Sequence, residues 1–247
     1  MIILKTPQEI KTMAKAGQIL REIIQEISQF IRPGLSTYDI EEKVNQLFKK
    51  AKVKSSFLNY HGFPSKICTS VNDQIVHGIP NKKVKIKTGD LVGIDIGIKY
   101  QGYNVDAAVT IPIEPIKPIH RKLIATTRRA LEKAIQEVRP NNYLSNIGAT
   151  IQETIEKAGF EVVKECSGHG IGRELHEDPT VLNFGKRNEG IILKPGMTFA
   201  IEPMAVEGKA VMKIENDGWT ISTVDGGYSA HFEKTVAVTR KGCQILT

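Results

Sequence analysis

The chain has 247 residues, of which 40% are hydrophobic and 25% are charged. This composition is typical of globular proteins and excludes a fibrous or intrinsically disordered chain. No stretch of about 18 apolar residues is present, so no membrane-spanning segment is expected. The formal net charge of +7 allows a polyanionic partner such as RNA but does not require one.

The cysteines and the first residues indicate the cellular compartment. Cys68, Cys166 and Cys243 are few and widely spaced, which fits reduced thiols better than a disulfide framework. Charged residues interrupt the start of the chain, so a secretory signal is not expected. We therefore expect a cytoplasmic protein.

Four helices and two long strands are predicted. The first helix begins at Pro7, because Thr6 and Glu9 form a capping-box pattern, and it ends before Pro33-Gly34. Hydrophobic residues recur in it about every 3.6 positions. The other helices are predicted near 37–51, 119–138 and 145–158. The strands are predicted at 91–98 and 104–111, with a turn at Gln101-Gly102, and further strands separated by glycine and proline fill the rest.

The sequence repeats itself at an offset of 107 positions. Arg32-Pro33 matches Arg139-Pro140, and Ile86-Lys87-Thr88-Gly89 matches Leu193-Lys194-Pro195-Gly196. Chance similarity among common residues is the alternative interpretation. The duplication predicts two α/β halves, roughly 1–112 and 113–247, which share one sheet in a single catalytic domain.

Each half carries two acids after its matching glycine. They are Asp95 and Asp106 in the first half, 11 residues apart, and Glu202 and Glu233 in the second, 31 residues apart, so about 20 residues are inserted. In a hairpin with an even loop, Asp95 and Asp106 fall on the same face, opposite or diagonal to each other. For a single strand acid, the simpler interpretation is that it caps a turn or faces water. Burial of four acids in apolar strands, however, would cost much free energy unless an opposite charge compensated them. The pattern therefore favours a cation that neutralises them.

The segment 167–176 is rich in glycine and contains His169 and His176. Their spacing is not the four-residue spacing of a helical zinc motif, and no Gly-Lys-Ser/Thr sequence of a phosphate-binding loop follows. We expect the glycines to bring the backbone close to a site into which both imidazoles point.

Four carboxylates and one imidazole are too many ligands for a single tetrahedral zinc ion. Because carboxylates can bridge, two divalent cations are the expected occupants, and Mn²⁺, Fe²⁺, Co²⁺ and Zn²⁺ would all suit. Cys166 lies near His169 in the sequence, which raises the alternative of a thiol nucleophile. That alternative would need His169 to be free, whereas the acids require it as a ligand.

These motifs resemble those of the methionine aminopeptidases. The resemblance covers essentially the whole chain and implies the pita-bread fold, an α+β fold in which two pseudo-symmetric α/β halves share a curved antiparallel sheet covered by helices. The gap between Glu202 and Glu233 leaves no room for the helical insert of type II members, so the chain resembles the short bacterial type I form. The motifs are Asp95, Asp106, Gly168-His169-Gly170-Ile171-Gly172, His176, Ile201-Glu202-Pro203, Glu233, Tyr60-His61-Gly62-Phe63-Pro64 and Ile75-Val76-His77-Gly78-Ile79-Pro80.

The resemblance implies removal of the initiator methionine from nascent proteins with a small second residue. Asp95 would chelate one ion, Asp106 and Glu233 would bridge both, and His169 and Glu202 would complete the other. The implied catalytic residues are His77, which would contact the scissile amide, His176, which would stabilise the oxyanion, and Glu202, which would shuttle a proton.

The resemblance also implies a pocket for the methionine side chain. Aromatic rings and sulfur suit a thioether. Many members have phenylalanine where this chain has Leu175, and bacterial members often have cysteine at Phe57, so the tolerance for the second residue is open. The implied pocket residues are Tyr60, Phe63, Cys68, Leu175 and Trp219.

Two other functions fit the same fold. Proline-specific peptidases usually carry a large extra N-terminal domain, whereas only about 90 residues precede Asp95 here. Non-enzymatic RNA- or protein-binding scaffolds would be expected to lose metal ligands, and all five are present.

Basic residues cluster at 49–52, 82–87 and 128–129. A solvated surface is the simpler interpretation of these clusters. Our hypothesis is that some of them dock the protein on ribosomal RNA near the nascent chain. We expect a monomer without a membrane partner.

Overall fold

The computed structural model describes residues 1–247 as helices and strands joined by turns. The helices are α1 (Pro7–Phe30), α2 (Thr37–Ala51), the 3₁₀ helix η1 (Tyr60–Gly62), α3 (Pro118–Gln136) and α4 (Ser145–Lys157). The strands are β1 (Lys54–Ser55), β2 (Cys68–Val71), β3 (Gln74–Val76), β4 (Leu91–Tyr100), β5 (Tyr103–Pro112), β6 (Glu161–Val162), β7 (Ser167–Gly170), β8 (Glu177–Leu182), β9 (Thr198–Ile201), β10 (Met204–Val206), β11 (Met212–Ile214), β12 (Ile221–Thr223), β13 (Ser229–His231), β14 (Lys234–Thr239) and β15 (Gly242–Ile245). None of the helices combines the length and the apolar character needed to span a lipid bilayer.

The four helices lie within two residues of their predicted ends. At the start of α1, the Thr6 hydroxyl accepts from the Glu9 N–H and the Glu9 carboxylate accepts from the Thr6 N–H, which confirms the predicted capping box. Ser36 and Asp39 form a second capping box at α2. In contrast, α3 and α4 begin without a side-chain cap.

Two antiparallel sheets form the centre of the molecule. In the first, β4 pairs with β1, β2 and β5, and the β4–β5 pairing runs from the Leu91–Pro112 pair to the Tyr100–Tyr103 pair around the predicted turn. The second has the order β15-β14-β9-β7-β8. Two three-stranded sheets, β13-β10-β6 and β11-β12-β3, complete the molecule.

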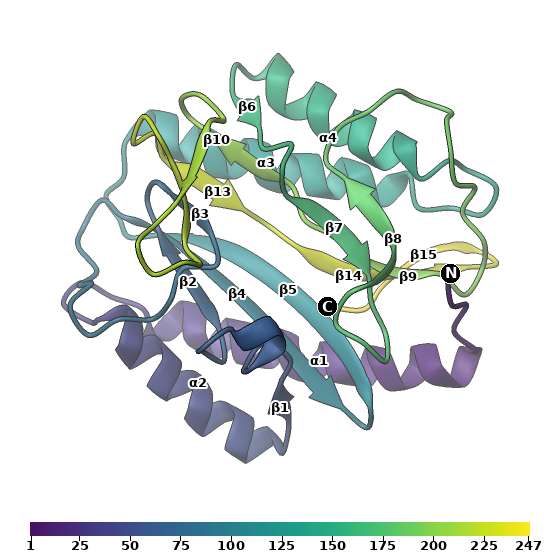
Figure 1. Ribbon diagram of the computed structural model, residues 1–247, viewed down its shortest axis with the longest axis horizontal. Helices are drawn as coiled ribbons and strands as arrows, with labels where there is room; N and C mark the ends of the chain where they lie inside the picture. The colour runs from purple at the N-terminus through teal and green to yellow at the C-terminus, as the bar shows by residue number, and fades with distance from the viewer.

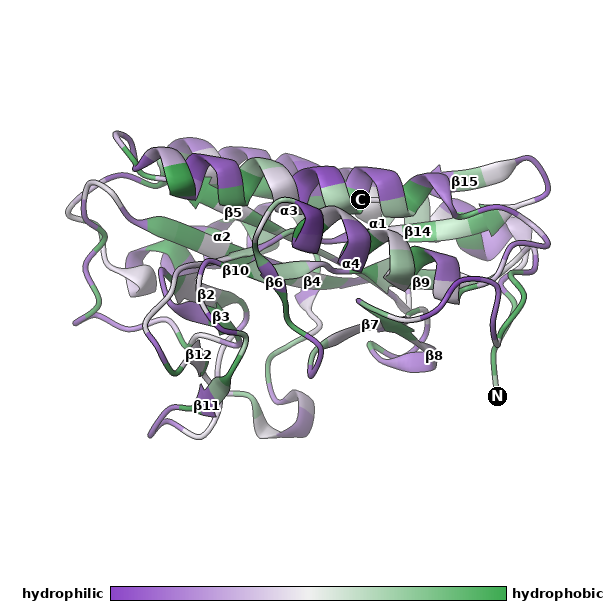
Figure 2. Ribbon diagram, turned by 90° about the horizontal axis from the view of Figure 1, so that it is seen from above, coloured by the Kyte–Doolittle hydropathy of each residue, from purple (hydrophilic) through white to green (hydrophobic).

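The helices cover one side of the strands. In Figure 1, α1 and α2 lie below the long strands and α3 and α4 lie above them. In Figure 2, α1 and α3 run along the top of the molecule, whereas β7, β8, β11 and β12 lie on the opposite side. The two helix pairs therefore back the central strands and leave the other face to loops and short strands.

Each helix pair has its own apolar core. Residues such as Met13 and Ile40 of α1 and α2 pack with Ile94 and other residues of β4 and β5. Leu123 of α3 lies in a second cluster, which includes residues of α4, β9 and β14. This arrangement confirms the predicted α+β class with antiparallel strands backed by helices.

Strand β5 meets β13 and β14 at a seam between neighbouring sheets. The Asp106 N–H donates to Thr235 Oγ1 (2.9 Å), and the Thr235 hydroxyl donates to the Asp106 carbonyl (2.8 Å). Thr110 makes the same two bonds to His231, each at 2.9 Å. Threonine hydroxyls thus take the place of direct ladder bonds and hold β5 beside β13 and β14.

Backbone hydrogen bonds recur at the offset found in the sequence. The Gly34 N–H donates to the Ile86 carbonyl, and 107 positions later the Asn141 N–H donates to the Leu193 carbonyl. The isolated bridges from Ser36 to Lys85 and from Tyr143 to Ile192 repeat the same correspondence. We propose on this basis that 1–112 and 113–247 are related halves of a single domain.

The correspondence shifts in the later strands because the second half is longer. The Gly89 N–H donates to the Ile113 carbonyl, and the Gly196 N–H donates to the Val238 carbonyl. The two acceptors are 125 positions apart, which is 18 more than the offset of 107. The insertion is therefore 18 residues rather than the expected 20 or so. At the larger offset Asp106 corresponds to His231, not to Glu233.

Candidate metal centre and substrate pocket

A pocket of about 330 Å³ brings the predicted site residues together. Its lining includes every residue that the sequence analysis assigned to metal, catalysis or substrate, and it also includes Phe57 and Cys166. The assigned residues in the lining are Tyr60, Phe63, Cys68, His77, Asp95, Asp106, His169, Leu175, His176, Glu202, Trp219 and Glu233.

The first two acids stand on the central hairpin. Asp95 of β4 pairs with Ala108, and Asp106 of β5 pairs with Gly97, so the two acids are diagonal neighbours on one face. This confirms the expectation from strand parity. Both carboxylates face the pocket from the middle of the sheet, where the backbone is held by pairing along its length.

The other two acids stand where β9 ends and β14 begins. Ile201 pairs with Lys234, so Glu202 and Glu233, the next residues, lie across from each other. The Glu233 N–H donates to the Ala108 carbonyl (2.9 Å), which ties this acid to the strand of Asp106. The seam between the sheets therefore brings the acids of the two halves together.

Burial and mutual repulsion disfavour the charged forms of these acids. Desolvation raises the pKa of Asp95, of Glu202 and of Glu233 well above the usual range, and the charge of Asp106 adds to each shift. Desolvation raises the pKa of Asp106 to about 7, although hydrogen bonds to Asp95 and to the Ala107 N–H oppose the shift. A nearby cation would remove this penalty.

The donor set fits a metal. Asp95 Oδ1 and Glu233 Oε1 are buried without a hydrogen-bond partner, which is costly for carboxylate oxygens. Ligand atoms of Asp106, His169 and Glu233 lie within 4.8 Å of one another. His169 Nε2 is 3.8 Å from Glu202 Oε1. Oxygen donors with one imidazole suit first-row divalent ions.

The histidines are held in neutral form. Desolvation lowers the pKa of His169 and of His77, and it lowers the pKa of His176 to about 3 with help from His169 and His77. His169 Nδ1 lies 3.0 Å from the Gly170 carbonyl, so it carries the hydrogen and Nε2 has a free lone pair. A neutral imidazole with a free Nε2 can bind a metal.

Glycine is required beside His169 for a steric reason. A Cβ on Gly168 would clash with the carbonyl oxygen of Ala200 on the adjacent strand. The segment forms strand β7 and packs directly against its neighbour, which presents His169 to the pocket. The ring centroids of His169 and His176 lie 4.2 Å apart, so both imidazoles reach the same place, as expected.

An apolar wall borders the acids. The Phe63 and Trp219 rings meet edge to face with centroids 5.2 Å apart, and Tyr60 meets His176 in the same way at 5.0 Å. Cys68 pairs with Asp95 on the neighbouring strand. This wall provides a soft apolar surface next to charged groups.

His77 enters the pocket from an uncommon backbone conformation. It follows β3 with φ of +59°, in the left-handed region that non-glycine residues rarely adopt. Its side chain is exposed at the pocket rather than packed in the core. Such strain is tolerated where the surroundings hold a residue in place.

The thiol alternative is not supported. Desolvation raises the pKa of Cys166 to about 12, and the charges of Glu202 and Glu165 add to the shift. Cys166 is therefore protonated near neutral pH and lacks the thiolate that a nucleophile needs.

The sequence analysis missed His231. Its Nε2 is 3.6 Å from Glu202 Oε2 and has no hydrogen-bond partner, and burial lowers its pKa to about 3. It lies two residues before Glu233, which is the same-face spacing of a strand. This two-residue spacing is the sequence feature that indicates His231, whereas the repeat marks only acidic residues.

A family model and known proteins match this chain over most or all of its length. The model of metallopeptidase family M24 matches residues 11–240. Methionine aminopeptidase 1 of Bacillus subtilis is 45% identical, over 100% of this chain and 99% of that protein. The crystal structure of methionine aminopeptidase from Thermotoga maritima has a TM-score of 0.98 with 44% identity, over 100% of this chain and 99% of that chain.

The fold also occurs in a different peptidase. An Xaa-Pro dipeptidase from Bacillus anthracis has a TM-score of 0.78 with 24% identity, and the match covers 99% of this chain but 61% of that one. At this identity the likeness shows the fold alone.

The fold and the acid-lined pocket define a metal-dependent peptidase with the predicted pita-bread architecture. The chain belongs to metallopeptidase family M24 and is a hydrolase. Its resemblance to methionine aminopeptidases, predicted from the motifs, is confirmed over the full chain.

Proposed function

We propose that this chain is a methionine aminopeptidase that works with two divalent metal ions. It removes the initiator methionine from nascent proteins whose second residue is small. The observation that carries the proposal is the convergence of four acids and His169 beside an apolar wall in one pocket. The names of the most similar proteins support the substrate.

The resemblance to the methionine aminopeptidases implies the metal ligands. Asp95 would hold one ion, Asp106 and Glu233 would be shared by both, and His169 and Glu202 would complete the other. Co²⁺, Mn²⁺, Fe²⁺ and Zn²⁺ all suit these donors. Bound metal ions would supply an activated water as the nucleophile near neutral pH.

Three residues of the chain act on the substrate in this proposal. Glu202, whose pKa is raised by burial, moves a proton toward the leaving amine. His176 is neutral because its pKa is lowered, so it donates a hydrogen bond to the oxyanion without adding charge. His77 contacts the scissile amide.

The apolar wall receives the methionine side chain. Tyr60, Phe63 and Trp219 supply aromatic surface for the thioether, and Cys68 and Leu175 complete the pocket. Phe57 packs closely over Gly97, since a Cβ there would lie 2.6 Å from its ring. Leu175 and Phe57 therefore set the shape of the pocket on two sides.

The partners follow from this activity. The substrate is the N-terminal methionine of a nascent chain in the cytoplasm, where the free thiols Cys68, Cys166 and Cys243 stay reduced. The basic residues of 49–52, 82–87 and 128–129 are exposed, and some of them contact ribosomal RNA. The protein acts as a monomer.

Two measurements test this function. Purified protein reconstituted with divalent metal should release methionine from Met-Gly-Met and leave a Gly-Pro dipeptide intact. Metal analysis should find two ions per chain. Cleavage of Gly-Pro would favour a proline-specific peptidase, and absence of both metal and cleavage would favour a non-enzymatic binding scaffold.

A further inference from the structure

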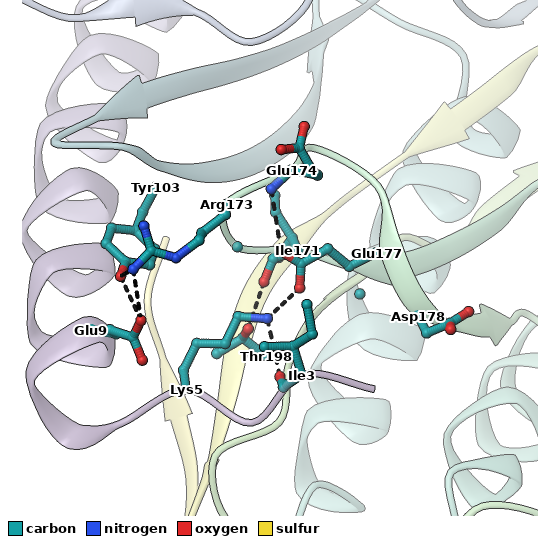
Figure 3. Close-up of polar contacts among 12 residues, drawn as sticks. Ile3, Lys5, Glu9, Tyr103, Ile171, Arg173, Glu174, Glu177, Asp178 and Thr198 are labelled. Atoms are coloured by element: carbon teal, nitrogen blue, oxygen red, sulfur yellow. Dashed lines mark hydrogen bonds and ion pairs between the residues drawn. The ribbon is translucent and has the colours of Figure 1, made fainter. Parts of the chain in front are cut away.

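A buried ion pair lies behind the glycine-rich segment. Lys5 Nζ pairs with the carboxylate of Glu177, and the two side chains are only 3% and 6% exposed. Lys5 Nζ also donates to the Ile3 carbonyl (3.1 Å). Figure 3 shows the ammonium group between the N-terminal segment and the segment 171–177. Neither Lys5 nor Glu177 lines the pocket.

A buried ion pair is an expensive way to join two segments. Removing both charges from water costs free energy, and replacement by apolar residues of similar size is often neutral or stabilising. Stability alone therefore gives no reason for charge at this position. The contacts of Glu177 offer another reason.

Glu177 connects the ion pair to the backbone of the pocket. One oxygen of its carboxylate meets Lys5, and the other, Oε1, accepts a hydrogen bond from the Glu174 N–H (3.2 Å). The next two residues are Leu175 and His176, whose side chains line the pocket. An apolar side chain at position 177 could not accept this bond.

A second set of contacts holds the same segment at Arg173, one residue before Glu174. Arg173 Nη2 lies 2.7 Å from the Tyr103 hydroxyl and 3.2 Å from Glu9 Oε1, as Figure 3 shows. Asn104 Nδ2 donates to the Arg173 carbonyl (2.8 Å). The start of α1 and the central hairpin therefore both hold the turn that leads to His176.

Gly172 provides the space that the ion pair needs. A Cβ at this position would lie 2.8 Å from both Glu177 Oε1 and Lys5 Nζ. The glycine thus serves the ion pair behind the pocket, whereas Gly168 serves strand packing.

We propose that Lys5 and Glu177 are positioning residues for Leu175 and His176. Lys5 fixes the carboxylate of Glu177, and Glu177 fixes the backbone of the turn through the Glu174 N–H. The turn then presents Leu175 to the methionine side chain and His176 to the oxyanion. This inference rests on the proposed function, because that function gives Leu175 and His176 their roles.

Two double variants separate positioning from stability. Lys5→Met with Glu177→Gln removes both charges but keeps an amide oxygen that can accept from the Glu174 N–H. Lys5→Met with Glu177→Leu removes the charges and the acceptor. Asp178→Ala is the control, since it removes the exposed ion pair between Asp178 and the N-terminal amine and leaves the pair of Lys5 and Glu177 in place. The single Lys5→Met variant is avoided because it leaves a buried carboxylate unpaired.

With Met-Gly-Met as substrate, we expect the Gln double variant and the control to keep kcat near that of the wild type. The Leu double variant should lose roughly 10- to 100-fold in kcat, since small misplacements of catalytic groups have effects of this size. The melting temperatures of the two double variants should be similar. Equal kcat for both double variants would overturn the proposal.

A second readout does not depend on turnover. The NMR signals of the His176 ring report its position, because the rings of Tyr60 and His169 lie edge-on to it at 5.0 and 4.2 Å. The chemical shifts of these signals should change in the Leu double variant and stay unchanged in the Gln double variant. The same result is expected in chelator and with added zinc. Unmoved signals in both would overturn the proposal, whereas failure to cleave Met-Gly-Met would count against the proposed function alone.

Discussion

The two halves of the molecule build similar strands but place different chemistry on them. In the first half, Asp95 and Asp106 stand diagonally on one hairpin. In the second, Glu202 and Glu233 lie across from each other, and His231 takes the position that corresponds to Asp106. Backbone pairing is thus repeated, while the side chains at equivalent positions differ. The proposed metal centre needs both halves because neither supplies all of the proposed ligands.

The halves also differ in how their helices begin. Thr6 and Ser36 cap α1 and α2 with complete capping boxes. Lys117 and Leu144 precede α3 and α4 and make no capping bond. The helices of the first half therefore begin with local side-chain hydrogen bonds that the helices of the second half lack.

The largest expected effect comes from removing one acid from each half. Asp106→Asn and Glu233→Gln should each lower kcat/KM for Met-Gly-Met by about 10³-fold or more, because each weakens the electrostatic centre of the site. Neither variant should melt at a lower temperature than the wild type in chelator, since burial already disfavours the charged form of each acid. If only the Asp106 variant lost activity, the second half would not contribute to the centre.

Metal removal should destabilise the folded protein, because the proposed ligands come from both halves. A ligand that binds only the folded state at 100 times its Kd adds about 2.7 kcal/mol, so chelator should lower Tm by about 5 to 10 °C. Calorimetry with and without chelator measures this shift. The Glu233→Gln variant should show a much smaller shift, and an unchanged wild-type Tm would contradict a shared metal centre.

The threonine seam allows a matched comparison. Thr235→Val and Thr110→Val remove the same two hydrogen bonds at equivalent buried positions, so each should cost about 2 kcal/mol in the free energy of unfolding. Thr235 holds Asp106, a proposed metal ligand, whereas Thr110 holds His231, which is not one, so Thr235→Val should lower kcat by about tenfold and Thr110→Val should lower it less. Equal kcat values for the two variants would show that the seam does not position the acid.

The smallest expected effect concerns the helix starts. Thr6→Ala removes the cap of α1 and should cost about 1 kcal/mol in the free energy of unfolding. Lys117→Ala at the start of α3 removes no capping bond and should change stability by less than about 0.5 kcal/mol. Urea denaturation of both variants measures the difference, and equal losses would refute the contrast between the halves.

Most elements could be predicted because their signals are local. The Thr6 cap, the turn at Gln101-Gly102 and the parity of Asp95 and Asp106 need only neighbouring residues. All the predicted pocket residues line one cavity. The repeat and the glycine-rich segment marked the acids and two histidines, and the resemblance to methionine aminopeptidases supplied the others.

The residue of the second half that corresponds to Asp106 could not be predicted. The acids suggested that Asp106 and Glu233 correspond, but backbone pairing matches Asp106 with His231. Register depends on contacts between strands that are far apart in the sequence, and an insertion of 18 residues hides it. The ion pair of Lys5 and Glu177, which are 172 residues apart, was hidden for the same reason.

The central claim is that the acids of both halves share one pair of metal ions. A crystal structure of the manganese-loaded protein, with anomalous scattering recorded from the metal, tests it most directly. We predict two anomalous peaks about 3.5 to 4 Å apart, with Asp106 and Glu233 bridging them. A single peak, or peaks that contact acids of only one half, would contradict the account.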